Sequence, residues 1–399
     1  MRFNIIQYFT VTKKNKMPRV CFKSCLLIIS IIFTGYSTSF AQNNFKQKFK
    51  NSFIYAGIEV GSKGVKMSVL EIGKNAKKNG SFNILHDTSI NTDFISFTQP
   101  TFTATLNGFS SLYTAAINTY KIPSERIFTA VSSGVKVSAD KEKKNDWITK
   151  LIDSFRIKIN EPARKVAVID VMEEARLSHI GIIPESRRYS TFLIDIGSGN
   201  TKGGYFPNGN ERELRLFQLT WGTKSAANEA SKRLEEDKSL VNYNKQLLRV
   251  LAGSAEAEIS YAVNVSGAYK MSDNIAVSGG IAWAVATMLY PELIDNPVVP
   301  VTFSEVQTFT EEIMKNHKSY SDSAVLKTLT DPTLNKAAIA AELKRANQVF
   351  DQRALMSGAG LLLKIMRQFE GIYEKKQFFL VKNGPVGWIS AYVDENISK

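Results

Sequence analysis

Two similar segments of the chain have the residue types of an anion-binding turn. Residues 59–62 read Glu-Val-Gly-Ser and residues 195–198 read Asp-Ile-Gly-Ser, and each follows an apolar stretch that predicts a β-strand. Glycines in a tight turn let backbone N–H groups approach an anion, and the serine hydroxyl adds a donor. The acidic residue before each turn could hold a divalent cation, directly or through water. A single turn is weak evidence, but two could grip a phosphate chain and its metal from both sides.

The order of elements around the two turns also repeats. After the first hairpin we predict strands at 82–90, 126–131 and 165–169, and helices at 106–120, 146–155 and 172–179. In the second copy we predict strands at 191–196, 202–205, 213–218 and 275–277, and a helix at 224–236. Antiparallel strands followed by alternating strands and helices indicate a mixed sheet flanked by helices. The sequence therefore predicts an α/β protein of two such lobes, with a ligand in the cleft between them.

The first 41 residues have the pattern of a cleavable signal peptide. They contain six basic residues and no acidic one, an apolar run at 26–33, and Ser39-Phe40-Ala41 as a small-x-small cleavage site. The apolar run is too short to span a bilayer stably, although an uncleaved anchor is the alternative. We expect export to the periplasm or another extracytoplasmic space, with no stable membrane span after cleavage. The start could be Met1 or Met17.

Composition excludes several other classes of protein. The chain has 399 residues, of which 44% are hydrophobic and 22% charged, as in ordinary globular proteins. Two cysteines and three histidines are too few for a disulfide scaffold or a zinc cluster. The formal charge is +14, and the six basic residues of the N-terminal segment leave +8 for the rest. The basic clusters lack interleaved aromatic residues, so we predict no nucleic-acid partner.

In this order, the motifs resemble those of the exopolyphosphatase / guanosine pentaphosphate phosphatase (Ppx/GppA) family, within the actin, sugar kinase and Hsp70 superfamily. The Glu-Glu-Ala-Arg-Leu sequence at 173–177 matches the family outright. Looser matches are the phosphate loops at 59–64 and 195–202, a strand end at 131–136, a Gly-Gly turn at 278–281, a helix at 353–360 and a closing strand near 378–382. The resemblance implies two ribonuclease H-like lobes with mixed sheets flanking a central cleft. Their expected bounds are 53–187 and 188–385, with 386–399 packing back on the first lobe.

The resemblance also implies an activity, namely hydrolysis of the terminal phosphate of polyphosphate or guanosine pentaphosphate. Glu174 would orient and deprotonate the attacking water, Lys136 would clamp the phosphate, and Asp195 and Glu59 would hold Mg²⁺. The phosphate-binding residues that it implies are Gly61, Ser62, Lys63, Ser133, Gly197, Ser198, Gly199, Asn200, Thr201, Lys202, Gly279 and Gly280. Such a site positions the phosphoryl group and neutralises its charge. Polyphosphate is the favoured partner, because nucleotide alarmones and ATP are cytosolic.

Four positions depart from the family pattern. Glu59 stands for an Asp, Lys63 for an Asn, Lys136 for an Arg, and Lys202 for a Glu that is usually catalytic. The changes make the pocket more cationic, so we expect it to hold a polyanion with less help from Mg²⁺. Two alternatives stay open: a catalytically decayed polyanion- or nucleotide-binding protein on the same fold, and an actin-like or kinase-like ATPase. The sequence identifies neither the substrate nor whether the chain forms a homodimer.

Overall fold

The computed structural model describes residues 45–397 apart from 80–81, 268–271, 371–375 and 383–386. The predicted signal peptide and both candidate start residues lie outside this part of the chain. No helix in the described part is both long enough and apolar enough to cross a membrane.

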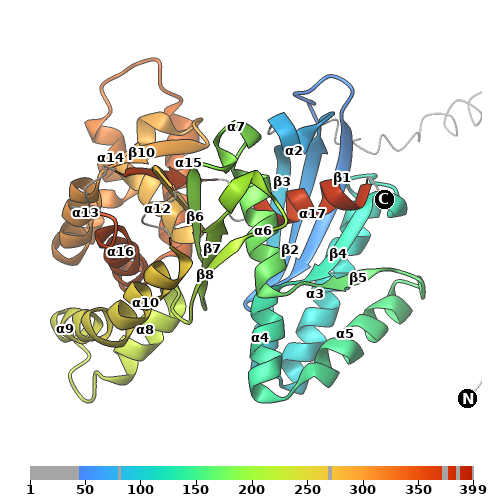
Figure 1. The fold of residues 1–399 in the computed structure, drawn as a ribbon, viewed down its shortest axis with the longest axis horizontal. Helices are drawn as coiled ribbons and strands as arrows, with labels where there is room; N and C mark the ends of the chain where they lie inside the picture. Colours follow the sequence, from blue (N-terminus) through green and yellow to red (C-terminus); the bar gives the residue numbers. More distant parts are fainter. Residues whose placement is uncertain (1–44, 80–81, 268–271, 371–375, 383–386, 398–399) are drawn as a thin grey trace, which may run out of the picture. The chain divides into compact units, whose positions relative to one another are not determined.

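The first sheet has five strands in the order β3-β2-β1-β4-β5 (Figure 1). They are β1 (Phe53–Val60), β2 (Gly64–Ile72), β3 (Phe82–Asn91), β4 (Ile127–Val131) and β5 (Val166–Val168). β1 pairs antiparallel with β2 and parallel with β4. The interior of β1 is buried on both faces, which is typical of a sheet covered by helices on each side. The predicted mixed sheet is therefore present.

Helices cover both faces of this sheet. The helices of this part of the chain are α2 (Ala76–Asn79), α3 (Gln99–Asn118), α4 (Ser133–Glu142), α5 (Asn145–Lys158), α6 (Val171–Ile182), α7 (Glu185–Arg188) and the C-terminal α17 (Gly387–Ile397). On one face Phe109 of α3 stacks on Phe155 of α5, beneath the alternate β1 residues Ile58 and Val60. α6 and α17 form a second apolar cluster on the other face.

The second sheet has six strands in the order β10-β11-β9-β6-β7-β8. The strands are β6 (Thr191–Ile196), β7 (Thr201–Tyr205), β8 (Arg215–Leu219), β9 (Asn274–Ser278), β10 (Val298–Val301) and β11 (Gln377–Val381). The helices are α8 (Thr223–Lys232), α9 (Leu240–Val250), α10 (Glu256–Ser266), α12 (Gly280–Leu289), α13 (Phe303–Asn316), α14 (Asp322–Thr328), α15 (Lys336–Val349) and α16 (Gln352–Arg367). β6 pairs antiparallel with β7 and parallel with β9, as β1 does with β2 and β4. The predicted fold class, two α/β units with mixed sheets, is confirmed.

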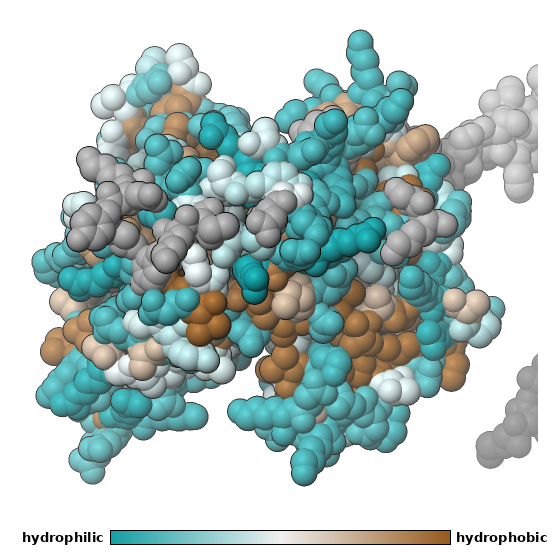
Figure 2. Space-filling model, in the orientation of Figure 1, coloured by the Kyte–Doolittle hydropathy of each residue, from teal (hydrophilic) through white to brown (hydrophobic). Residues whose placement is uncertain are grey.

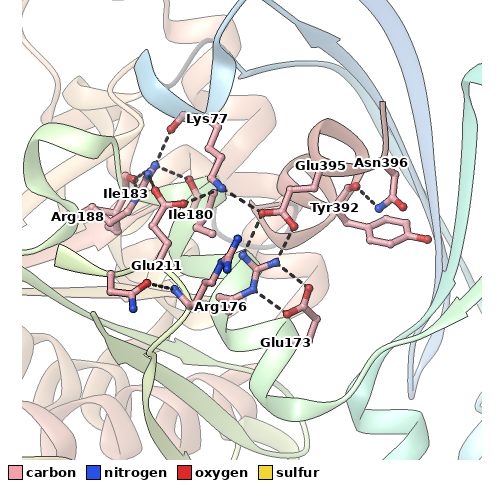
Figure 3. A network of polar contacts seen from close by, with 12 residues as sticks. Lys77, Glu173, Arg176, Ile180, Ile183, Arg188, Glu211, Tyr392, Glu395 and Asn396 are labelled. Atoms are coloured by element: carbon pink, nitrogen blue, oxygen red, sulfur yellow. Dashed lines mark hydrogen bonds and ion pairs between the residues drawn. The ribbon is translucent and has the colours of Figure 1, made fainter. Parts of the chain in front are cut away.

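A network of charged side chains joins the C-terminal helix to α6 (Figure 3). The Arg176 guanidinium contacts both oxygens of Glu173, at 2.7 and 2.8 Å, and both oxygens of Glu395 on α17, at 3.0 and 2.6 Å. Such bidentate pairs fix geometry as well as contributing energy. Arg176 of the Glu-Glu-Ala-Arg motif therefore holds α17 against α6.

The buried Glu71 carboxylate on β2 makes stability depend on pH. It accepts hydrogen bonds from the N–H groups of Lys48 (2.8 Å) and Phe49 (2.7 Å) and from the side chains of Ser52 (2.6 Å) and Asn83 (2.9 Å). Burial acts to raise its pKa, but these bonds outweigh burial and lower the pKa to about 2. Because the folded pKa lies below the unfolded value of 4.5, the stabilisation is complete above that pH and is lost as the pH falls towards 2.

We predict that Glu71→Gln lowers the free energy of unfolding by about 3 kcal/mol at pH 7, from the size of this pKa shift. Urea unfolding of both proteins at pH 7 and at pH 3 measures the difference, which should shrink at the lower pH. A difference that is the same at both pH values would show that the carboxylate charge is not responsible.

Candidate active site

Each hairpin places a lysine directly opposite its acidic residue. In the β1–β2 pair Glu59 is the partner of Lys66, and in the β6–β7 pair Asp195 is the partner of Lys202. Directly opposed residues of an antiparallel pair lie on the same face of the sheet. The two hairpins thus repeat an acid–lysine pair as well as a Gly-Ser turn.

Lys202 of the second hairpin is buried among carboxylates. Its Nζ atom lies 2.6 Å from Oε1 of Glu174 and 3.8 Å from Oδ2 of Asp195, and the residue is only 7% exposed. Burial acts to lower the pKa of Lys202, but the two carboxylates outweigh burial and raise it. The ammonium therefore stays charged. In the structure the ammonium of Lys202, a predicted phosphate-binding residue, contacts these carboxylates.

Glu174 is held at both oxygens. It lies in the first turn of α6, which the Asp170 side chain caps, and it is 2% exposed. Oε1 receives the Lys202 ammonium, and Oε2 accepts the N–H of Ser133 at 2.7 Å. Burial alone would raise the pKa of Glu174, but Lys202 and Ser133 hold it below the usual value. The carboxylate is therefore ionised and fixed in orientation.

The two predicted metal ligands lie beside this pair. Asp195 accepts a hydrogen bond from the Ser278 hydroxyl at 3.0 Å. Burial raises the pKa of Asp195, although the charge of Lys202 acts to lower it. Burial raises the pKa of Glu59 to about 7, and the charge of Glu174 adds to the rise. Lys66 and Lys202 act on Glu59 in the opposite direction. Three acidic side chains thus share one region with Lys202.

Three further lysines lie around the turns. Burial lowers the pKa of Lys63, and the neighbouring ammonium groups of Lys224 and Lys66 lower it further. Lys63 belongs to the first turn, whereas Lys224 is at the start of α8 beside the second. Within the described part of the chain, none of the three has a carboxylate within 4.0 Å. Their charges are therefore available to a bound anion.

The two turns have the same closing hydrogen bond. The Gly61 N–H donates to the Gly64 carbonyl at 2.8 Å, and the Gly197 N–H donates to the Asn200 carbonyl at 2.9 Å. The first amide of each turn is thus used internally. In the described part, the amides that follow donate to no protein acceptor, namely those of Ser62, Lys63, Ser198 and Gly199. These amides could bind phosphoryl oxygens.

Neighbouring helices fix both turns. A Cβ atom at Gly134, near the start of α4, would lie 2.8 Å from the Ser62 hydroxyl. The N–H groups of Thr223 and Lys224 donate to the carbonyls of Gly197 (3.0 Å) and Ser198 (2.7 Å). The start of α8 therefore holds the second turn, and α4 lies against the first.

Several predicted site residues make contacts within the protein. Gly279 has a φ of +100°, and a Cβ there would lie 2.2 Å from the Ile196 carbonyl oxygen, so only glycine fits. Gly280 faces the Phe350 ring, and the buried Thr201 hydroxyl donates to the Trp221 carbonyl at 2.7 Å. The Ser133 N–H donates to the Glu174 carboxylate at 2.7 Å.

Lys136 is not brought into the carboxylate cluster. It lies on α4, where its ammonium contacts the Asp140 carboxylate of the same helix at 2.7 Å. Sequence reasoning instead missed Lys66 and Lys224. A signal for Lys66 was available, because it follows Glu59 at the same interval at which Lys202 follows Asp195.

An apolar groove of about 520 Å³ borders the second turn at Asn200. Its apolar walls come from α4, α6, β8 and α10, and include Val137, Val171, Leu216 and Tyr261. Figure 2 shows that the face in view is mainly hydrophilic, with apolar residues gathered in patches between. The second turn is therefore next to both cationic side chains and an apolar surface.

Comparisons with known proteins support the fold. No family model and no curated protein sequence matches the chain. Among solved structures, a Ppx/GppA family member from Aquifex aeolicus is 17% identical, with a TM-score of 0.55 over 86% of this chain and 99% of that one. An exopolyphosphatase-like protein is 13% identical, with a TM-score of 0.55 over 87% and 100%. An exopolyphosphatase from Cytophaga hutchinsonii is also 13% identical, with a TM-score of 0.51 over 86% and 98%.

These matches define the class of structure. The chain has the two-lobe, actin-like ATPase fold of the Ppx/GppA structures, as its motifs predicted. At these identities the likeness concerns the fold.

Proposed function

We propose that this protein is a phosphoanhydride hydrolase that removes the terminal phosphate from polyphosphate or a similar phosphate polyanion. The observation that carries the proposal is the ionised Glu174 carboxylate, which is held by one group beside each turn. Lys202 fixes it from the second hairpin, and the Ser133 N–H fixes it from the helix that lies against the first turn. A fixed carboxylate beside an anion site is the arrangement that water activation requires.

The backbone amides of the turns and the lysines beside them would bind the phosphate chain. The amides of Ser62 and Ser198 would donate to phosphoryl oxygens, and the ammonium groups of Lys63, Lys66 and Lys224 would neutralise their charge. Charge-assisted hydrogen bonds of this kind are about twice as strong as neutral ones. A ligand with several phosphates would engage more of these groups than a single phosphate could.

Glu174 would accept the proton of the attacking water. Each carboxylate oxygen has a second lone pair, so the contacts with Lys202 and Ser133 leave Glu174 able to accept another hydrogen bond. Its lowered pKa makes it a weaker base but keeps it fully ionised at neutral pH. Proton transfer and positioning would then act together at the terminal phosphate.

The place of action follows from the predicted signal peptide at 1–41. An exported enzyme would meet polyphosphate more readily than cytosolic nucleotides. We therefore propose an extracytoplasmic hydrolase of polyphosphate.

A second candidate is a polyanion- or nucleotide-binding protein without catalysis. The 2.6 Å contact between Lys202 and Glu174 favours it, because an ion-paired carboxylate is a poorer base. The apolar groove at Asn200 favours a nucleotide as ligand. A nucleobase can pack against an apolar surface, whereas polyphosphate has no apolar group to place there.

Chain-length analysis of linear polyphosphate separates the two candidates. The wild-type protein should release inorganic phosphate while the remaining chains shorten from their ends. Parallel incubations with ATP and guanosine pentaphosphate test the nucleotide alternative. Retention of polyphosphate on the protein with no phosphate release would favour the binding protein and contradict the enzyme.

A further inference from the structure

The Lys202 side chain lies where the resemblance to Ppx/GppA proteins implies a divalent cation. Its ammonium contacts Glu174 at 2.6 Å and Asp195 at 3.8 Å, and the charge of Glu59 also acts on it. These residues are the predicted catalytic base and both predicted metal ligands. The three carboxylates therefore already share a cation that belongs to the chain itself.

A divalent cation does not fit among these carboxylates while Lys202 remains there. Mg²⁺ demands oxygen ligands at about 2.1 Å in near-octahedral geometry, and an ammonium a few Å away would repel it. In the described part of the chain, no group of three or more His, Cys, Asp or Glu side chains is arranged to hold a metal ion. To enter, the ion would have to displace a buried lysine and leave that charge without its partners.

Lys202 determines the balance of charge around the site. The carboxylates are Glu59, Glu174 and Asp195, and the ammonium groups in or beside the turns are Lys63, Lys66, Lys202 and Lys224. Lysines outnumber carboxylates in this set, so the region attracts anions without an added ion. A glutamate at position 202 would reverse this balance.

We propose that Lys202 is a built-in cation that takes the place of the divalent metal, so that the site binds phosphate without Mg²⁺. The nature of the ligand rests on the proposed function, whereas the exclusion of metal is a property of the folded chain alone. A covalently attached cation cannot be removed by chelation, and its charge does not vary with the supply of metal outside the cytoplasm.

Titration of the purified protein with Mn²⁺, followed by electron paramagnetic resonance of the free ion, tests the exclusion without any activity assay. The wild-type protein should bind no Mn²⁺ saturably. Lys202→Glu should gain a saturable site, because it removes the ammonium and adds a fourth carboxylate. Lys245→Glu is the matched control, with the same change of charge at an exposed position of α9, and should resemble the wild type.

Stoichiometric Mn²⁺ binding by the wild type that Asp195→Asn abolishes would overturn the proposal. A folded Lys202→Glu protein that binds no Mn²⁺ would also overturn it, since Lys202 would then not be what excludes the metal. If Lys202→Glu fails to fold, the neutral Lys202→Gln replaces it and should gain a weaker saturable site. Absence of phosphate release by the wild type would count against the proposed function and leave these binding outcomes unaffected.

Discussion

Replacing Glu174 by glutamine is expected to lower kcat for phosphate release from polyphosphate by about 10³-fold, within the range that general-base catalysis contributes. The amide keeps the shape of the side chain and can still accept from the Ser133 N–H, but it cannot take a proton from water. The substitution weakens the contact with Lys202, but the turns and the ammonium groups of Lys63, Lys66 and Lys224 are untouched. Polyphosphate binding should therefore persist, and the loss should appear in kcat rather than in KM.

Glu173→Gln is the matched control for this experiment. Glu173 is the preceding residue of α6, and its carboxylate contacts Arg176 rather than Lys202. Its replacement should leave kcat unchanged and cost about 1 kcal/mol of stability or less, as for other accessible ion pairs. Equal release by the wild type and by Glu174→Gln would remove Glu174 from the mechanism.

A large loss of stability is expected on replacement of Arg188. This residue is 1% exposed, and its guanidinium donates to the carbonyls of Lys77 (2.6 Å) and Ile183 (3.2 Å) and pairs with Glu211 (Figure 3). Arg188→Met keeps much of the volume but leaves these acceptors without their donor. We expect the free energy of unfolding to fall by about 3 kcal/mol, as for other broken buried pairs.

Urea unfolding of Arg188→Met and Arg187→Met measures this effect. Arg187 is the preceding residue and is exposed, so its replacement should change stability little. Similar stability of the two variants would show that the buried network around Arg188 does not hold α7 and α2 in place.

The repeated hairpins could be predicted from sequence because their signal is local. An apolar strand, an acidic residue and a Gly-Ser turn define each one, and the order of strands and helices then indicates the sheets. The prediction missed α4, whose residues 133–142 are mostly polar and include a serine and a glycine at the start. Its position depends on contacts with the first turn and with Glu174, which no local pattern reveals.

The role of Lys202 could not be predicted in the same way. The sequence has a lysine where the resemblance to Ppx/GppA proteins implies a glutamate. The direction of its ammonium, however, depends on α6, which brings Glu174 to it from another part of the chain. For Lys136, in contrast, a contact within its own helix explains where the ammonium lies. The motif suggested a phosphate clamp, yet an acidic residue one helical turn later, Asp140, is within reach of its ammonium.

Phosphate release from linear polyphosphate in the presence of EDTA is the most direct test of a hydrolytic site whose cation is Lys202. We predict that the wild-type protein keeps its rate of release when EDTA is added and that Glu174→Gln loses it under the same conditions. Loss of wild-type release on chelation, with recovery when Mg²⁺ is restored, would contradict the role of Lys202. Absence of release with and without Mg²⁺ would contradict the hydrolase itself.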